Sequence, residues 1–130
     1  WELPEMASSD AVEVREWFRR RQAKFPHWNT TLEAELRDEF GLAEHLEKSL
    51  FMLSKGSRRK LGLVVAFACG APVNLLDIPF AALDARSSDL LSDLLADAAS
   101  HPTRAWVMTD FELPADLLDV PLANTIELGN

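Results

Sequence analysis

The sequence predicts an α/β fold in which a helical front half precedes part of a mostly parallel sheet with flanking helices. Two observations predict it. Apolar residues recur at helical spacing as far as Gly41, and short apolar runs then alternate with apolar helical stripes. The strand–helix–strand order of the back half favours parallel strands joined by right-handed crossovers. With 130 residues and a mass of 14.5 kDa, the chain has room for one domain with one core.

Two helices are predicted in the front half. Asp10 and Glu13 resemble a capping box at the start of the first helix. Thr30 and Glu33 repeat this spacing at the start of the second helix, which ends at Gly41. The apolar stripes consist of Val14, Trp17, Phe18 and Phe25 in the first helix and of Leu32, Leu36 and Phe40 in the second.

Two helices and three strands are predicted in the back half. A helix over 58–70 is expected to be buried because its residues are apolar almost all round. Asp84 can cap the next helix, whose apolar stripe consists of Leu90, Leu91, Leu94, Leu95 and Ala98. The predicted strands are short apolar runs bounded by turn residues, at 73–77, 105–109 and 122–128.

Charge and composition exclude several classes of function. Thirteen Lys and Arg against 21 Asp and Glu give a formal charge of -8, so we expect no nucleic-acid partner. The single cysteine, Cys69, cannot form an internal disulfide and is typical of a reducing compartment. The sequence has no apolar run long enough to span a membrane and no signal peptide at its start, so any membrane association is expected to go through a partner.

Residues 53–57 precede three cations and form a candidate anion site. Ser54 can cap the helix that follows, and Gly56 lets another group approach the backbone closely. The cations at 58–60 oppose the helix dipole by about 0.3–1 kcal/mol each, which suggests either a compensating anion or pairing with acids of the chain. Asp77 ends a predicted strand, where it can hold a metal ion or satisfy a turn.

Three segments resemble motifs of one family, the ATP-binding cassette (ABC) transporter ATPases. In family order and spacing they are the signature at 53–57, the Walker B strand at 73–77 and the D-loop at 79–84. The resemblance implies a helical subdomain over 1–52. Over 53–130 it implies the signature helix with the Walker B and D-loop part of a P-loop NTPase-type sheet. The five glycines do not have the Walker A spacing, so the resemblance implies that this loop lies before Trp1.

The resemblance also implies roles for individual residues. The signature would contact the γ-phosphate of ATP held by a partner subunit, and it consists of Leu53, Ser54, Lys55, Gly56 and Ser57. Asp77 would help to hold Mg²⁺, and the D-loop at the subunit interface includes Ala82, Leu83 and Asp84. ATP and Mg²⁺ are the implied cofactors. The implied partners are a second nucleotide-binding subunit and a transmembrane permease, at whose inner, cytoplasmic face the protein would lie.

Two positions depart from the family and leave the chain without a catalytic residue of its own. Ile78 stands where ABC ATPases carry a catalytic glutamate, and it can neither accept a proton nor orient water. Asp110 stands where they carry the switch histidine, and an acid there would repel the γ-phosphate. Pro79 is expected to keep Ile78 extended. The resemblance thus predicts a degenerate ATP-binding subunit that supplies its signature to a partner, with its own hydrolysis left open.

A non-catalytic interaction protein with the same architecture is the alternative. Its helical front half would dock a membrane subunit through exposed aromatic side chains, unless these side chains form the core instead. The aromatic residues in question are Trp17, Phe18, Trp28 and Phe51. Loss of the nucleotide response with intact partner binding would favour this alternative.

Overall fold

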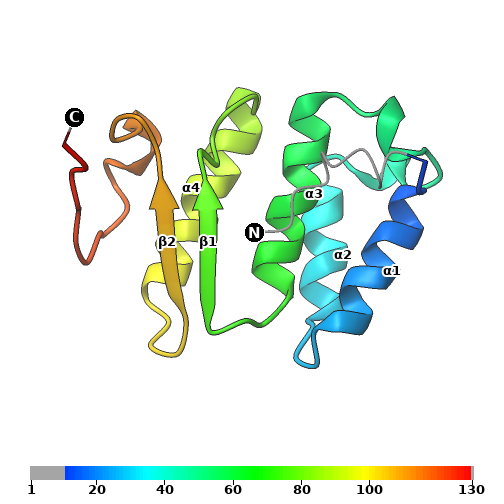
Figure 1. Cartoon of the computed structure of the whole chain (residues 1–130), viewed down its shortest axis with the longest axis horizontal. Helices are drawn as coiled ribbons and strands as arrows, with labels where there is room; N and C mark the ends of the chain where they lie inside the picture. Colours follow the sequence, from blue (N-terminus) through cyan, green and yellow to red (C-terminus); the bar gives the residue numbers. More distant parts are fainter. Residues whose placement is uncertain (1–10, 130) are drawn as a thin grey trace.

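The computed structural model of the chain describes residues 11–129. Its helices α1, α2 and α3 lie together in one half of the molecule, and two strands with helix α4 form the other half (Figure 1). The elements are α1 (Val14–Lys24), α2 (Thr30–Glu39), α3 (Lys55–Ala68), β1 (Val73–Asp77), α4 (Ala85–Ala99) and β2 (Ala105–Thr109). Three short 3₁₀ helices are at Ala43–His45, Leu50–Met52 and Ala115–Leu117. This arrangement confirms the predicted α/β fold.

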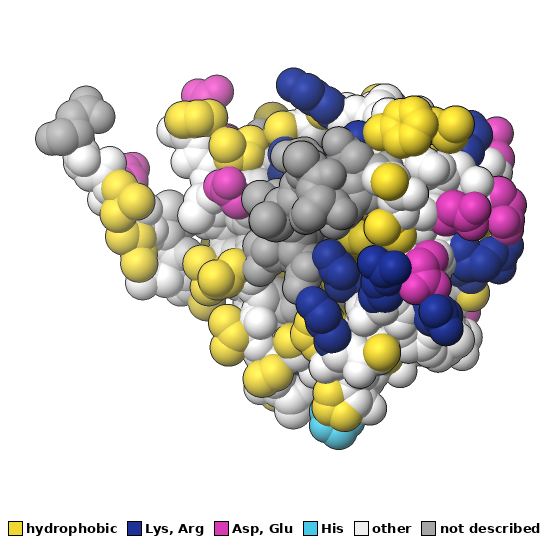
Figure 2. Space-filling view, turned by 45° about the vertical axis from the view of Figure 1, so that its right-hand side comes forward, with side chains coloured by type: hydrophobic (Ala, Val, Ile, Leu, Met, Phe, Trp, Pro, Cys, Tyr) yellow, Lys and Arg dark blue, Asp and Glu magenta, His cyan; other side chains and the backbone are white. Residues whose placement is uncertain are grey.

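The sheet of the described residues has two parallel strands, as the strand–helix–strand order predicted. Leu75 of β1 is in register with Val107 of β2, and Asp77 with Thr109. One face packs on the core, where Leu76 is 1% exposed. The other face is turned away from α4, and Leu75 and Val107 remain 54% and 49% exposed on it. Figure 2 shows hydrophobic side chains scattered among charged ones on one side of the molecular surface.

Helix α3 is the buried helix of the core, as its apolar composition predicted. Residues 61–68 of α3 are all buried, and α2 packs directly against this helix. The helix ends before Gly70, whose φ of 70° lies in the left-handed region that glycine adopts without strain. A Cβ atom at Gly70 would lie 2.5 Å from the carbonyl oxygen of His27, so the chain can turn toward β1 only with glycine here.

The helix caps agree with the sequence only in part. Asp84 caps α4 as predicted, and its side chain accepts a hydrogen bond from the Ser87 N–H. The cap of α2 is Asn29, whose side chain accepts from the Leu32 N–H, so the prediction of Thr30 as the cap is wrong by one residue. Asparagine and threonine are both common helix caps. The cap is the last residue with an extended backbone before the helix, and here that residue is Asn29. The predicted cap at Asp10 lies outside the described residues.

The predicted third strand is wrong. Residues 122–128, all of which the structure describes, have no strand conformation, and Ile126 and Leu128 are 77% and 88% exposed. An apolar run becomes a strand only when a neighbouring backbone pairs with it, and this segment has no such pairing with β1 or β2. The sequence pattern contains no information about that pairing.

The aromatic residues of the front half are mostly core, which argues against the aromatic docking surface. Trp17 and Phe18 are 1% and 2% exposed, and Trp28 packs partly buried against the core. Phe51 is the exception at 60% exposed. Within residues 11–129, no helix combines the length and the apolar character that crossing a membrane requires.

Candidate functional site

The candidate site includes the start of α3. Ser54 is exposed and caps this helix, because its Oγ accepts a hydrogen bond from the Ser57 N–H at 3.1 Å. Lys55 is exposed as well, whereas Leu53 is 8% exposed and anchors the preceding turn in the core. The first N–H groups of a helix have no carbonyl partner within it, so this end is suited to an anion.

Gly56 lies against the backbone of the connection between β1 and α4. A Cβ atom at Gly56 would lie 2.5 Å from the carbonyl oxygen of Ala82, which is far closer than two such atoms can approach. Only glycine fits there without a shift of the connection. The segments that resemble the signature and the D-loop are therefore in direct contact.

The carboxyl ends of β1 and β2 lie side by side. Asp77 and Thr109 are in register, and the Thr109 hydroxyl donates a hydrogen bond to Asp77 Oδ1 at 2.5 Å. The Ile78 N–H donates to the Thr109 carbonyl at 2.9 Å. Asp110 directly follows Thr109, is exposed, and accepts a hydrogen bond from the Phe111 N–H at 2.7 Å. Ile78 and Asp110 thus follow the ends of adjacent strands.

The connection after β1 contains two residues in the left-handed region of backbone conformation. Ile78 has a φ of 44° and Ala82 a φ of 60°. The expectation that Pro79 keeps Ile78 extended is therefore wrong. The hydrogen bond from the Ile78 N–H to Thr109 continues the pairing of the strands, and the Ala81 N–H bonds back to the Ile78 carbonyl at 3.2 Å. These bonds outweigh the local preference of a residue before proline.

Two cations after the signature bind groups of the chain itself. Arg59 Nη1 donates to the carbonyl oxygen of Asp77 at 2.8 Å, and Lys60 Nζ lies 2.8 Å from Asp84 Oδ2. The predicted pairing with an acid of the chain is confirmed for Lys60, whereas the partner of Arg59 is a backbone carbonyl. The Lys60 ammonium, together with the Ser87 N–H, holds the pKa of Asp84 far below its usual range.

Sequence reasoning missed the parts that Thr109 and Arg59 play at the end of β1. A signal for Thr109 was present, because it ends its strand as Asp77 does, and the carboxyl ends of parallel strands meet at one edge of a sheet. Arg59 had no such signal. Its partner is a backbone carbonyl 18 residues away, and a residue pattern does not encode that contact.

The donors at the strand ends fit a magnesium ion held together with a phosphate ligand. They are the carboxylate of Asp77 and the hydroxyl of Thr109, and Mg²⁺ prefers such hard oxygen ligands. Mg²⁺ keeps several waters and takes one or two protein ligands beside substrate phosphates, so a small donor set is sufficient. Residues 11–129 contain no group of three or more His, Cys, Asp or Glu that could hold a metal without such a ligand.

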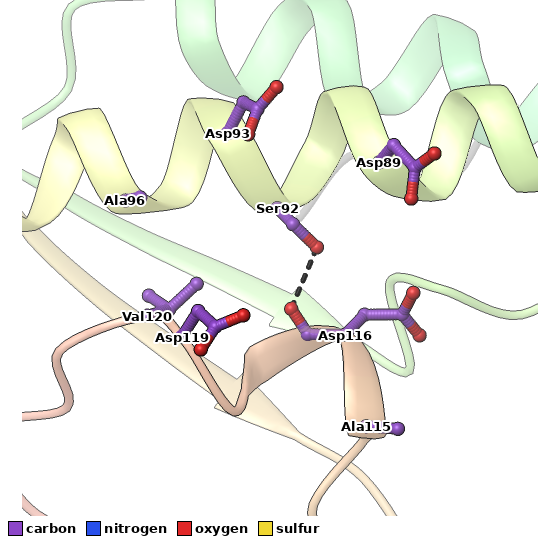
Figure 3. A pocket seen from close by; sticks show the side chains of 8 residues that line it. All are labelled: Asp89, Ser92, Asp93, Ala96, Ala115, Asp116, Asp119 and Val120. Carbon is purple, nitrogen blue, oxygen red and sulfur yellow. Dashed lines mark hydrogen bonds between the residues drawn. The ribbon is translucent and has the colours of Figure 1, made fainter.

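An acidic hollow between α4 and the 3₁₀ helix Ala115–Leu117 is separate from these motifs (Figure 3). It has a volume of about 470 Å³, and its acidic lining residues are Asp89, Asp93, Asp116 and Asp119. Ser92 closes one side by donating its hydroxyl to the Asp116 carbonyl at 2.8 Å. None of the motif residues lines this hollow, and its carboxylates would repel a nucleotide.

Curated proteins of similar sequence are ATP-binding proteins of import or transport systems. The chain is 33% identical over 79 residues to the phosphonates import ATP-binding protein PhnC of Paraburkholderia xenovorans, which covers 61% of the chain and 26% of the relative. It is 32% identical over 104 residues to the zinc transport system ATP-binding protein AdcC of Streptococcus pneumoniae, covering 80% of the chain and 43% of the relative. With the taurine import ATP-binding protein TauB of Pseudomonas aeruginosa it shares 46% identity over 57 residues, or 44% of the chain and 22% of the relative.

The chain therefore spans less than half the length of these relatives. No protein-family model matches it. Among solved structures, RNase-L Inhibitor superposes with a TM-score of 0.63 at 19% identity, over 82% of the chain and 21% of that protein. An ABC transporter in an inward-facing conformation gives a TM-score of 0.60 at 24% identity, over 86% and 48%. These likenesses concern the fold.

Proposed function

Since the chain is a relative of the ATP-binding proteins of ABC transporters and has the fold of their nucleotide-binding domain, we propose that it is part of such a subunit. Its own contribution is the signature, which it presents to ATP held by a partner subunit. The observation that carries the proposal is the contact of Gly56 with Ala82, which joins the exposed start of α3 to the D-loop. The two segments that face a partner nucleotide in this family thereby form one surface.

Each residue of this surface has a defined task in the proposal. Ser54 and Gly56 contact the γ-phosphate, while Leu53, Lys55 and Ser57 complete the signature around them. Residues 82–84 form the D-loop at the subunit interface. Residues 1–52 are the helical subdomain, and 53–130 are the signature helix with the Walker B and D-loop part.

The proposed subunit hydrolyses ATP poorly or not at all by itself. Asp77 and Thr109 would hold Mg²⁺, which would supply positive charge to the phosphate oxygens. Ile78 offers no atom that can take a proton from water, although its backbone is at the end of β1. Asp110 places a negative charge at the neighbouring strand end, where a phosphate would be repelled.

The proposed partners are a second nucleotide-binding subunit and a transmembrane permease. Two of the named relatives serve the import of phosphonates or taurine, and the third belongs to a zinc transport system. We extend import to this chain as part of the proposal. The proposal places the protein on the cytoplasmic side of the membrane, held there by the permease. The negative net charge of -8 speaks against a nucleic acid as a further partner.

Substitutions of Ser54 test the signature assignment in the assembled complex. Ser54→Asp keeps a good helix cap but places a negative charge against the γ-phosphate, so we expect the ATPase rate of the complex to fall at least about tenfold. Ser54→Thr keeps both the cap and the hydroxyl, and is the matched control. These changes are sharper than a substitution of Gly56, because any side chain there would disturb the packing on Ala82. The measurements are complex assembly and steady-state ATP turnover.

Equal turnover of the Ser54→Asp and Ser54→Thr complexes would refute the signature assignment. If assembly were intact in that case, the result would favour the non-catalytic interaction function.

A further inference from the structure

The start of α3 and the connection from β1 to α4 are joined by three separate contacts. Gly56 lies against the Ala82 carbonyl, and Arg59 donates to the Asp77 carbonyl at 2.8 Å. Lys60 Nζ donates to Asp84 Oδ2 at 2.8 Å. The first contact lets the segments touch, and the other two attach α3 to both ends of the connection.

The connection needs external support because its backbone is strained. Ala82 has a φ of 60°, a conformation that is unfavourable for a residue with a Cβ atom. The hydrogen bonds inside the turn are long, with 3.2 Å from the Ala81 N–H to Ile78 and 3.3 Å from the Leu83 N–H to Phe80. Strained residues of this kind persist where the surroundings hold them.

Asp84 is placed to supply this support because it serves two elements at once. Its Oδ1 caps α4 through the Ser87 N–H at 2.9 Å, and its Oδ2 binds Lys60 of α3. The Lys60 side chain is only 15% exposed, whereas that of Asp84 is 57% exposed. Lys60 is thus fixed by packing and gives the D-loop carboxylate a stationary partner.

We infer that Lys60 is a positioning residue that holds the D-loop against the signature helix, so that both present one surface to the partner's nucleotide. The functional meaning of this contact rests on the proposed function, but the contact itself does not. Lys60 lies outside the signature, one turn further along the same helix. The inference therefore gives a role to a residue that the signature assignment did not include.

Hydrogen exchange of the full chain tests the inference without nucleotide or partner. In Lys60→Gln, the amides of Ala81 and Leu83 are expected to exchange about two- to fivefold faster, as the loss of a partly exposed ion pair allows. Lys60→Arg keeps the charge and is expected to restore slow exchange. Lys55→Gln removes an exposed lysine five residues earlier on the same helix and is the matched control.

Titration of the Asp84 carboxyl by NMR supplies a second readout that a loss of packing alone would not give. In Lys60→Gln, the pKa of Asp84 is expected to rise toward the ordinary value of about 3.9, and in Lys60→Arg it is expected to stay low. Equal exchange and an equal Asp84 pKa in Lys60→Gln and Lys55→Gln would overturn the inference, as would failure of Lys60→Arg to restore both. Either result would leave the Ser54 assay, and with it the proposed function, to be decided separately.

Discussion

Ile78 has a side chain and a backbone conformation that do not suit each other. Its φ of 44° lies in the left-handed region, which is costly for a residue with a Cβ atom and most of all for a β-branched one. The hydrogen bond from its N–H to Thr109 holds it there. The backbone at this strand end is therefore set by the sheet, whichever side chain occupies the position.

A residue that tolerates the left-handed region is expected to stabilise the protein at this position. Ile78→Asn should raise the free energy of unfolding by about 1 kcal/mol, because asparagine adopts positive φ at lower cost. Ile78→Leu, which keeps an apolar side chain but gains no such tolerance, should change it by less than about 0.5 kcal/mol. Urea unfolding at constant m-value measures both, and an asparagine variant no more stable than the leucine variant would contradict the expectation.

At the scale of elements, Arg104 joins the end of α3 to the start of β2. Its guanidinium donates to the carbonyls of Ala66 and Ala71 at 2.9 Å and of Phe67 at 3.1 Å. It also lies 4.9 Å from the centre of the Trp106 ring. Carbonyls at the end of a helix need such donors, and one planar side chain reaches all three here. Cys69 Sγ also donates to the Ala66 carbonyl and Asn74 Nδ2 to that of Ala71.

A lysine cannot replace this arrangement, although it keeps the charge. Arg104→Lys is expected to lower the free energy of unfolding by about 1–3 kcal/mol, since buried carbonyls lose donors and the contact with the indole ring is lost. Arg86→Lys, at an exposed position on α4, is the control and should have little effect. Thermal and urea unfolding measure the stability of both variants. Equal stabilities would show that the planar guanidinium of Arg104 contributes nothing that a lysine cannot supply.

The elements that local chemistry determines were predictable from the sequence. Both strands have the predicted bounds because prolines and polar residues delimit short apolar runs, and α4 begins after its cap at Asp84. The features that depend on distant contacts were not predictable. They include the absence of a strand over 122–128, the partners of Lys60 and the positive φ of Ile78. The roles assigned to the motif residues stay predictions.

At the scale of the whole molecule, the described residues 11–129 cover the sheet on one face only. Parallel sheets in proteins are generally covered on both faces, yet Val73, Leu75 and Val107 are 58%, 54% and 49% exposed. Contiguous apolar side chains of this kind promote association. The chain by itself is therefore expected to self-associate through this face.

Replacing one of these side chains is expected to weaken the association. Leu75→Thr keeps a residue that favours strands but makes the face more polar, so the concentration at which the chain associates should rise about fivefold or more. Leu118→Thr changes a leucine that is 72% exposed but lies outside the sheet, and should have no such effect. Sedimentation velocity over a range of concentrations measures both, and identical behaviour of the two variants would place the association elsewhere.

The close approach of Gly56 to Ala82 also affects how the evolutionary history of such a chain is interpreted. A glycine in a signature invites the interpretation that nucleotide binding is still under selection. Here a carbonyl of the same chain excludes every larger side chain, so selection for folding alone would preserve this glycine. The motif can therefore outlast the activity. Ser54 is exposed, and its task as the cap of α3 could also be met by threonine, aspartate or asparagine, so a serine here says more than the glycine about whether the chain still meets a nucleotide.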